Sequence, residues 1–499
     1  MTRYDVVVIG SGLGGLTAAA ILAGAGRKVL VIERSNSVGG AASSYKAGDL
    51  FIEASLHKTS GPQHPRDPKH RPLTRAGVLD KVEWVPTGTL HEVRGGPLDQ
   101  PFVLPEGFDA AREALTARFP DQRAGVAAII AEMQALAASD GTPDALRKAL
   151  PDNGHFTMSL SERFAAAFGD NEAVKCAIAG NLWYFHDDPA KLSWPFFGAG
   201  QGHFLQSGGR YVKTGSQRLS SALARTVLRS AGCAVLLRRL VTAIDVDATG
   251  RPAVITHEAK TGGDPQQVEA GCIISNAAPG IATKLLRNGL GERLAASYAD
   301  ETPSISLFAL TLGLSKPPET VGLNAYSTQL LPDWMKRLAD YREGTLLFAN
   351  EPAARMPPMS IVNYDAIDSG VPTAPHIVSV VGTDRVANWR GMERPAYEAK
   401  KSRWQKAIIA ALDRTYPGLA EAVVASAFNT ANSMVTYLNQ PDGCAYGFAP
   451  LPLHGTVTHR SPRTVIDGLY LASAYAGYGG YNGAILAGEA CADAILADA

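Results

Sequence analysis

Two short apolar runs with an alanine-rich stretch between them open the chain. The first run covers residues 4–9 (YDVVVI) and the second covers residues 29–32 (VLVI). The stretch between them carries small apolar residues at helical spacing, and Gly24 and Gly26 end it before the second run. The pattern predicts a strand, a helix and a second strand over residues 4–33.

Glycines fill the turn between the first run and the helix. Gly10 permits a tight turn, Gly12 lets a pyrophosphate approach the backbone, and Gly15 allows close contact between helix and strand. Leu13 and Gly14 complete the turn, and free N–H groups at the start of the helix face the phosphates. Because the turn stands within a complete strand–helix–strand unit, it predicts a site for the ADP half of a dinucleotide.

An acidic residue and a second glycine pair narrow the choice of nucleotide. Glu33 ends the second run, where its carboxylate accepts hydrogen bonds from ribose hydroxyls and disfavours a 2′-phosphate. This position indicates FAD or NAD and not NADP. Gly39 and Gly40 then allow the chain to double back along an elongated cofactor, which favours FAD.

The segment after Glu33 resembles the fingerprint shared by flavoproteins of the amine oxidase, GDP-dissociation inhibitor and phytoene desaturase superfamily. The resemblance implies that the segment lies along the pyrophosphate and ribityl chain of FAD. The residues expected to bind FAD there are Arg34, Gly39, Gly40, Ala41 and Ser43.

A second block of alternating elements follows after about two hundred residues. Gly208 and Gly209 precede a predicted helix over residues 217–230, and strands are expected over residues 234–237, 241–245 and 272–277. In the superfamily, a block of this order is similar to the second return of the chain to the FAD domain. That resemblance implies that the backbone at Val241 meets the adenine.

A third block ends the chain. An apolar run over residues 467–474 leads into a glycine-rich turn over residues 477–483, and an alanine-rich helix follows to residue 497. The positive end of such a helix and its free N–H groups favour the negative charge of a reduced flavin. The residues expected to bind FAD at this end are Ser473, Gly480, Tyr481 and Asn482.

Taken together, these segments resemble the phytoene desaturase group, including its retinol saturase and carotenoid isomerase relatives. The segment over residues 436–447 favours the saturase and isomerase side. The chain departs from the group at Asn482, where many relatives have proline, and at Ser55, where a glycine commonly precedes the histidine at position 57. Ala474 replaces an acidic residue of some flavoproteins in the wider superfamily.

The resemblance implies an α/β fold with a Rossmann-like FAD-binding domain built from discontinuous segments. A chain of 499 residues exceeds one typical core, so several lobes are expected. We expect an α+β substrate domain and a helical lid beside the FAD domain. The expected boundaries are 1–75, 200–300 and 426–499 for the FAD-binding domain, 76–199 for the helical lid and substrate region, and 301–425 for the substrate-binding domain.

The two regions outside the FAD segments are largely apolar, which suits a long hydrophobic substrate. Aromatic residues cluster over residues 183–185 and 194–197, where they serve either as core or as substrate contacts. A stripe of apolar residues at helical spacing over residues 124–138 serves either as core or as a peripheral membrane contact, and core packing is the favoured interpretation.

Catalytic side chains are expected near the flavin ring. The resemblance places His57 beside the isoalloxazine, where it either donates a proton to a reacting carbon, holds a substrate head group, or only packs. Tyr446 is a weaker candidate. The run His186-Asp187-Asp188 lacks the spacing of a metal site, so no metal is expected.

Composition excludes several classes of partner and compartment. The 47 basic and 47 acidic residues balance, which argues against nucleic acid. Five cysteines without Cys-x-x-Cys spacing indicate neither a disulfide framework nor zinc, and they fit a reducing compartment. The chain shows neither a membrane-spanning run nor a signal sequence, so a cytoplasmic enzyme with possible peripheral membrane contact is expected.

These expectations combine into an FAD-dependent oxidoreductase that introduces, reduces or isomerises carbon–carbon double bonds in a long apolar substrate by hydride exchange at flavin N5. A second complete dinucleotide turn is missing, because residues 198–202 lack a third glycine and a later acid. The electron partner is therefore oxygen, a quinone or a transiently bound nicotinamide. The alternatives are a flavin amine oxidase, for which Cys491 lies too deep in the last helix to attach the flavin, and a non-catalytic prenyl-binding escort protein of the GDP-dissociation inhibitor type.

Overall fold

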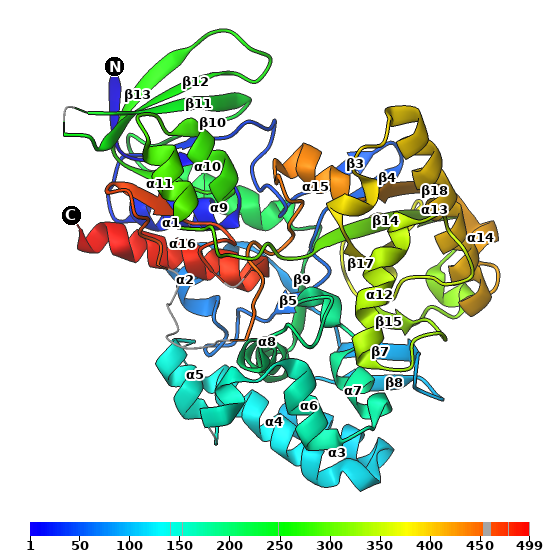
Figure 1. Cartoon of the computed structure of the whole chain (residues 1–499). Coiled ribbons are helices and arrows are strands. Elements are labelled where there is room, and N and C mark those ends of the chain that lie inside the picture. The colour runs from blue at the N-terminus through cyan, green and yellow to red at the C-terminus, as the bar shows by residue number, and fades with distance from the viewer. Residues whose placement is uncertain (140, 152, 248, 453–460, 478, 499) are drawn as a thin grey trace.

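The computed structural model describes residues 1–139, 141–151, 153–247, 249–452, 461–477 and 479–498. Figure 1 shows three regions: a sheet with helices that holds both termini, a second sheet with its own helices, and a group of helices below them. A small sheet of β5 (Thr59–Ser60), β9 (Gly209–Val212) and β6 (Trp84–Pro86) lies where the three regions meet. Contacts between the regions therefore converge on residues 57–60.

The first sheet is assembled from three distant stretches of the chain. Its order is β10, β2, β1, β13, β12 and β11, with β19 paired to β13. The strands are β1 (Thr2–Ile9), β2 (Val29–Ile32), β10 (Ala234–Leu236), β11 (Arg239–Val246), β12 (Pro252–Ala259), β13 (Gln266–Ser275) and β19 (Leu469–Leu471). All pairs are parallel except β11 with β12 and β12 with β13. The parallel strands are apolar because helices cover the sheet, and the α/β class expected from the sequence is confirmed.

The first and last helices pack on each other beside this sheet. Helix α1 (Leu13–Gly24) is buried at every residue from Leu13 to Ala23, between the sheet, α9 (Gln217–Arg229) and α16 (Gly480–Ala497). A Cβ atom on Gly488 of α16 would lie 2.4 Å from the carbonyl oxygen of Gly14. A Cβ atom on Gly14 would lie 2.0 Å from the carbonyl oxygen of Ala472. Glycine at these positions thus sets how closely the two helices approach.

The second sheet is mostly antiparallel and carries its own apolar core. Its order is β18, β14, β17, β16, β15, β7 and β8. The strands are β7 (Thr89–Gly95), β8 (Phe102–Pro105), β14 (Ser306–Leu314), β15 (Ser327–Leu331), β16 (Met359–Asn363), β17 (His376–Asp384) and β18 (Val423–Asn429), and the long helix α13 (Arg394–Thr415) packs on β18. Strand β7 joins β15 in parallel, so part of the expected helical region 76–199 belongs to this sheet.

The third region is a helical group with an aromatic core. Its main helices are α3 (Phe108–Arg118), α4 (Arg123–Ala138), α6 (Leu160–Phe168), α7 (Glu172–Ala179) and α8 (Trp194–Ser207). The apolar stripe of α4 is buried, as expected for core packing. The glycines of residues 198–202 lie inside α8, where a Cβ atom on Gly202 would lie 2.3 Å from the Met133 carbonyl oxygen of α4. This glycine-rich stretch therefore serves the packing of α8 on α4.

Within the described residues, we find no helix that combines the length and apolarity needed to cross a membrane.

Substituting Gly488 by alanine should loosen the contact between α1 and α16. The added methyl group meets backbone and not a flexible side chain, so we expect a loss of about 1–3 kcal/mol in stability, as for other overpacked positions. Gly280→Ala is the matched control, because nothing lies within 4 Å of a Cβ atom there and the residue sits in helix α10 (Pro279–Leu285). Urea unfolding followed by circular dichroism compares the midpoints. An unchanged midpoint for Gly488→Ala would contradict the packing argument.

Candidate functional site

Two glycine loops meet at the start of α1. Gly10 has a φ of 91°, which favours glycine, and it turns the chain from β1 toward α1. Gly12 forms an isolated parallel bridge with Gly39, and the Gly39 N–H donates to the Ser11 carbonyl at 2.9 Å. Gly40, with a φ of 58°, is exposed beside them. Because Gly12 has no side chain, it leaves the first N–H groups of α1 available for an anion.

The Glu33 carboxylate holds the first loop in place. It accepts from the Ser11 N–H at 2.9 Å, from the Ser11 hydroxyl at 2.7 Å and from the Ser35 N–H at 2.7 Å. The Arg239 N–H donates to the Glu33 carbonyl at 2.9 Å, which brings Val241 of β11 close to this corner. Glu33 and Val241 were predicted from different arguments, and β11, which carries Val241, begins beside Glu33.

Sequence reasoning missed Asn276, which follows β13 directly. Its Oδ1 accepts from the Gly15 N–H at 2.8 Å. A Cβ atom on Gly12 would lie 2.5 Å from the Asn276 Nδ2, and one on Gly15 would lie 2.8 Å from the Asn276 Cβ. These two glycines therefore make room for Asn276, in addition to the roles expected from the loop alone. The polar end of the third predicted strand was the available signal for it.

The first turn of α16 lies across from the second glycine pair. Its N-cap is Gly479, and a Cβ atom there would lie 2.5 Å from the Tyr446 carbonyl oxygen, which places Tyr446 against this turn. Ser55 connects the two sides, since its hydroxyl donates to the Ala41 carbonyl at 2.7 Å and lies 3.3 Å from the Tyr481 hydroxyl. The serine that departs from the family pattern thus has a structural role.

Two other expected residues border these loops, and a third points away from them. The Ser43 hydroxyl donates to the Gly40 carbonyl at 3.0 Å, and the Ser473 hydroxyl accepts from the Tyr475 N–H at 3.3 Å just after β19. The Arg34 guanidinium instead points to α15 (Ala431–Leu438), where it donates to the Tyr437 carbonyl at 2.6 Å. Tyr478, part of the expected glycine turn, lies outside the described residues.

A buried ion pair supports the first turn of α16. The Lys69 ammonium donates to Asp67 at 2.8 Å, to the Ser60 hydroxyl at 2.7 Å and to Asn482 Oδ1 at 2.6 Å. The Ser207 hydroxyl donates to the other Asp67 oxygen at 3.0 Å. Both charged side chains are fully buried. Burial lowers the pKa of Lys69. Burial is also the largest influence on Asp67 and raises its pKa, but the Lys69 charge and the hydrogen bonds to Asp67 together hold that pKa below its usual value.

A second group of buried polar atoms lies near the same segment. The His57 Nδ1 and Nε2, the Lys58 Nζ and the Tyr184 Oη are buried and have no hydrogen-bond partner within the described part of the chain. Buried polar groups are normally satisfied, so such atoms mark where a bound molecule or water completes the bonding. The His57 ring lies edge-on to Trp183, with 5.4 Å between ring centroids. Burial, followed by the Lys58 charge, lowers the pKa of His57 to about 4.

Glu53, at the end of β4 (Leu50–Glu53), is a buried carboxylate behind Tyr481. It accepts from the Ser216 N–H at 2.9 Å and from the Tyr211 hydroxyl at 3.3 Å. Burial raises the pKa of Glu53 to about 7, although Ser216 and then other donors oppose the shift. Glu53 is therefore a neutral acid over much of the acidic range.

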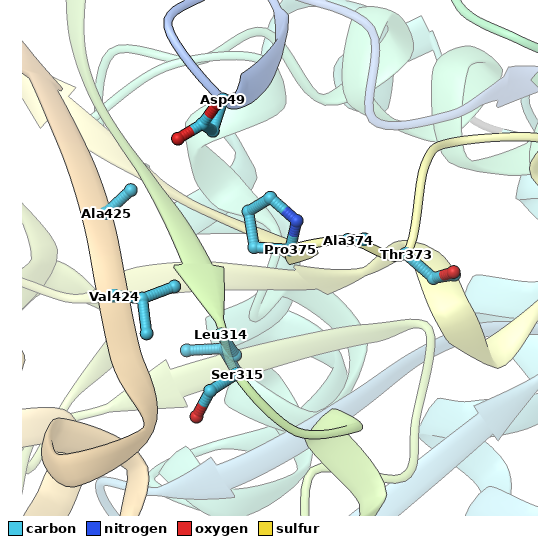
Figure 2. A pocket seen from close by; sticks show the side chains of 8 residues that line it. All are labelled: Asp49, Leu314, Ser315, Thr373, Ala374, Pro375, Val424 and Ala425. Carbon is cyan, nitrogen blue, oxygen red and sulfur yellow. The ribbon is translucent and has the colours of Figure 1, made fainter.

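Two shallow surface hollows lie elsewhere. The first, of about 380 Å³, opens between the ends of β14 and β18 and the turn around the Ala374-Pro375 bond (Figure 2). Its single carboxylate is Asp49, which stands apart from the apolar lining (Figure 2). The second, of about 330 Å³, is lined by residues around Tyr45 and Gln217. None of the glycines described above lines either hollow.

Comparison with known proteins identifies relatives along almost the whole chain. The model of the family described as flavin containing amine oxidoreductase matches residues 13–496. Human all-trans-retinol 13,14-reductase is 26% identical over 300 residues, covering 55% of this chain and 47% of that protein. Carrot (Daucus carota) prolycopene isomerase is 24% identical over 532 residues, covering 99% of this chain and 80% of that protein. The chain thus spans about half the length of the retinol reductase.

Solved structures agree on the fold. Cyclohexylamine oxidase from Brevibacterium oxydans matches with a TM-score of 0.63 at 15% identity, over 99% of each chain. At this identity the likeness concerns the fold alone. Together with the family match, it confirms the predicted resemblance, the Rossmann-like α/β class and FAD as the cofactor.

Breaking the buried Lys69–Asp67 ion pair should destabilise the protein more than breaking an exposed ion pair. Lys69→Met leaves the Asp67 carboxylate buried without a cation, so we expect a loss of about 3–5 kcal/mol in stability. The double variant with Asp67→Asn should lose less than the sum of the single variants, because neither charge is then left alone. Thermal unfolding measures all three, and Asp368→Asn, at the exposed pair with Lys213, is the control expected to stay near the wild type. Additive losses would contradict this coupling.

The raised pKa of Glu53 predicts a pH dependence of stability. Between pH of about 4.5 and about 7, the folded state holds a proton that the unfolded state has released, so this group's contribution to stability falls as the pH rises. Glu53→Gln cannot lose the proton, so its melting temperature should gain on the wild type as the pH increases through this window. Glu113→Gln, at an exposed helical position, should show no such trend. A constant difference between Glu53→Gln and the wild type at all pH values would refute the assignment.

Proposed function

The chain belongs to the family of flavin-containing amine oxidoreductases, and on that premise we propose that it introduces, reduces or isomerises a carbon–carbon double bond in a long apolar substrate. The observation that supports this proposal most is the group of buried aromatic residues around the N-terminus of α16. Tyr446 lies against Gly479, and burial followed by the neighbouring Tyr446 raises the pKa of Tyr184 far above its usual value. An aromatic, largely apolar interior thus begins where the flavin ring is expected.

Two sets of residues are expected to bind the two ends of FAD. We propose that the α1 N–H groups bind the pyrophosphate and that Glu33 and the Val241 backbone bind the adenosine. The first turn of α16, with Tyr481 and Asn482, faces the ring system, where its N–H groups favour negative charge. Bound FAD supplies hydride transfer at N5, and the protein supplies position and electrostatics.

Residues outside the nucleotide-binding loops would exclude water from the site and place protons. Trp183, stacked on Tyr184 with 4.2 Å between ring centroids, gives a long apolar molecule an extended flat surface. His57 stands at its edge, on the segment that contacts α16 through Ser55 and Thr59. We propose that His57 positions the substrate or carries a proton at the reacting carbon, with Tyr446 as the second candidate.

Two features of relatives bear on the choice of reaction. The carrot relative is an isomerase by its name and aligns over nearly the whole chain, whereas the retinol reductase aligns over half of its own length. Amine oxidation is the second candidate, favoured by the family's description. Lys58, which has no hydrogen-bond partner among the described residues, lies near the aromatic interior, and its protonated form disfavours a cationic amine there. The electron partner is oxygen, a quinone or a transiently bound nicotinamide.

Purified protein should be yellow and should release FAD on denaturation. We expect all-trans-retinol or prolycopene to change when incubated with it, and mass spectrometry of the product tells the reactions apart. Loss of two hydrogens means desaturation, gain of two means reduction, and an unchanged mass with a new retention time means isomerisation. Reduction is assayed with prereduced flavin under argon.

The alternatives give different results in the same preparation. Oxygen consumption with cyclohexylamine but not with polyenes would favour amine oxidation over our proposal. A colourless protein that binds prenyl lipids would favour an escort role. FAD-loaded protein that leaves every polyene and lipid unchanged would contradict double-bond chemistry.

A further inference from the structure

A buried lysine without a partner stands out beyond the cofactor residues. Lys58 is 4% exposed, and its Nζ atom has no hydrogen-bond partner within the described part of the chain. It lies 6.0 Å from the centroid of the Phe204 ring. A Cβ atom on Gly209 would lie 3.3 Å from the Lys58 Cδ, so the absence of a side chain at Gly209 makes room for the lysine.

The charges around Lys58 do not neutralise it. Glu106 is the nearest acidic influence, but its carboxylate accepts from the Gly209 N–H at 2.6 Å and lies 3.8 Å from the Arg210 guanidinium. His57 and His91 also face Lys58, and burial, followed by the Lys58 charge, lowers their pKa values to about 4 and about 3, so both rings are neutral near pH 7. Glu106 is thus shared with Arg210, and the protonated form of Lys58 has no counter-ion of its own among the described residues.

A group of rings lies between Lys58 and the residues near the start of α16. Phe204 lies 6.1 Å from Tyr184, which stacks on Trp183, and the Trp183 ring is met by His57. Tyr446, beside Gly479, influences Tyr184 from the other end. Lys58 and the start of α16 therefore border the same group of rings, so we expect a long molecule that reacts at the start of α16 to come within reach of Lys58.

We infer that the substrate carries a carboxylate at the end of its apolar body and that Lys58 binds this carboxylate, with the nitrogens of His57 along its path. The inference rests on the proposed function and specifies its substrate class. An unpaired buried ammonium is costly, and an anionic ligand supplies the missing partner through a charge-assisted hydrogen bond. A terminal hydroxyl or hydrocarbon leaves the charge uncompensated. Lys58 in this role is a binding residue and takes no part in hydride transfer.

The titration of Lys58 gives a second, independent signature of the same contact. Burial lowers the pKa of Lys58 to about 7, with Glu106 opposing the shift, so the amine is only partly protonated at neutral pH. A bound carboxylate favours the charged form and raises that pKa. Binding should therefore be accompanied by proton uptake near pH 7, whereas a neutral ligand of the same length should bind without it.

The test compares ligands that share one chain and differ in the head group. FAD-loaded protein is titrated with oleate and with oleyl alcohol, and binding is followed by tryptophan fluorescence and the flavin spectrum. We expect oleate to bind at least about tenfold more tightly. Lys58→Met should remove this preference while leaving the affinity for the alcohol nearly unchanged, and Lys58→Arg should retain it. Lys260→Met, at an exposed position, is the matched control and should behave as the wild type.

Calorimetry in two buffers of different ionisation enthalpy measures the proton uptake. Wild-type protein should take up protons with oleate, and Lys58→Met should not. Equal affinities for oleate and the alcohol in the wild type, or a preference that survives in Lys58→Met, would overturn the inference. If Lys58→Met fails to fold, the wild-type preference and its proton uptake decide the question. If FAD-loaded protein converts neutral polyenes but shows no preference for oleate, only the proposed carboxylate of the substrate is refuted. If the purified protein contains no FAD, the proposed function itself is refuted.

Discussion

The close backbone contact between α1 and α16 is the constraint on which the site depends. Gly14 and Gly488 let the first and the last helix of the chain approach until one backbone meets the other. The same approach carries the two glycine-capped helix starts to one corner of the sheet. In the proposed function, both ends of an extended dinucleotide would then meet N–H groups and helix dipoles of the right sign. A side chain at either glycine would separate parts of the site that lie more than 470 residues apart in sequence.

Polar side chains then hold the first turns of α1 and α16 in position. Asn276 ties the end of β13 to the first turn of α1, and the Lys69–Asp67 pair ties the first turn of α16 to the small sheet where the three regions meet. Ser55 bridges the second glycine pair and α16. These contacts are directional, so they hold the loops in one arrangement while the glycines themselves remain free of side chains. The aromatic interior that ends at Lys58 begins on the other side of the same segment.

Much of the proposed nucleotide site was expected from the sequence because its motifs are local. The turn over residues 10–15, the acid at Glu33 and the glycines at Gly39 and Gly40 each depend on spacing within a short stretch, and the structure places them around one corner. Other features were beyond local reasoning. The strand β7 was assigned to a helical region because its partner β15 lies over two hundred residues away. The glycine-rich residues 198–202 lack the pattern of a dinucleotide turn, and the structure shows what two of them do instead: Gly198 and Gly202 accommodate α4.

The sequence by itself indicated the strand–turn–helix units through the geometry of a few consecutive residues, and it indicated the family and FAD through the resemblance of its glycine motifs to those of known flavoproteins. Only the tertiary structure decided which side chains meet across the chain: Asn276 with Gly15, Lys69 with Asn482, and Lys58 with no partner among the described residues. Burial and pairing depend on elements from distant stretches packing together. The energetic cost of an unpaired buried charge, and hence what it says about a ligand, becomes visible only when that packing is known.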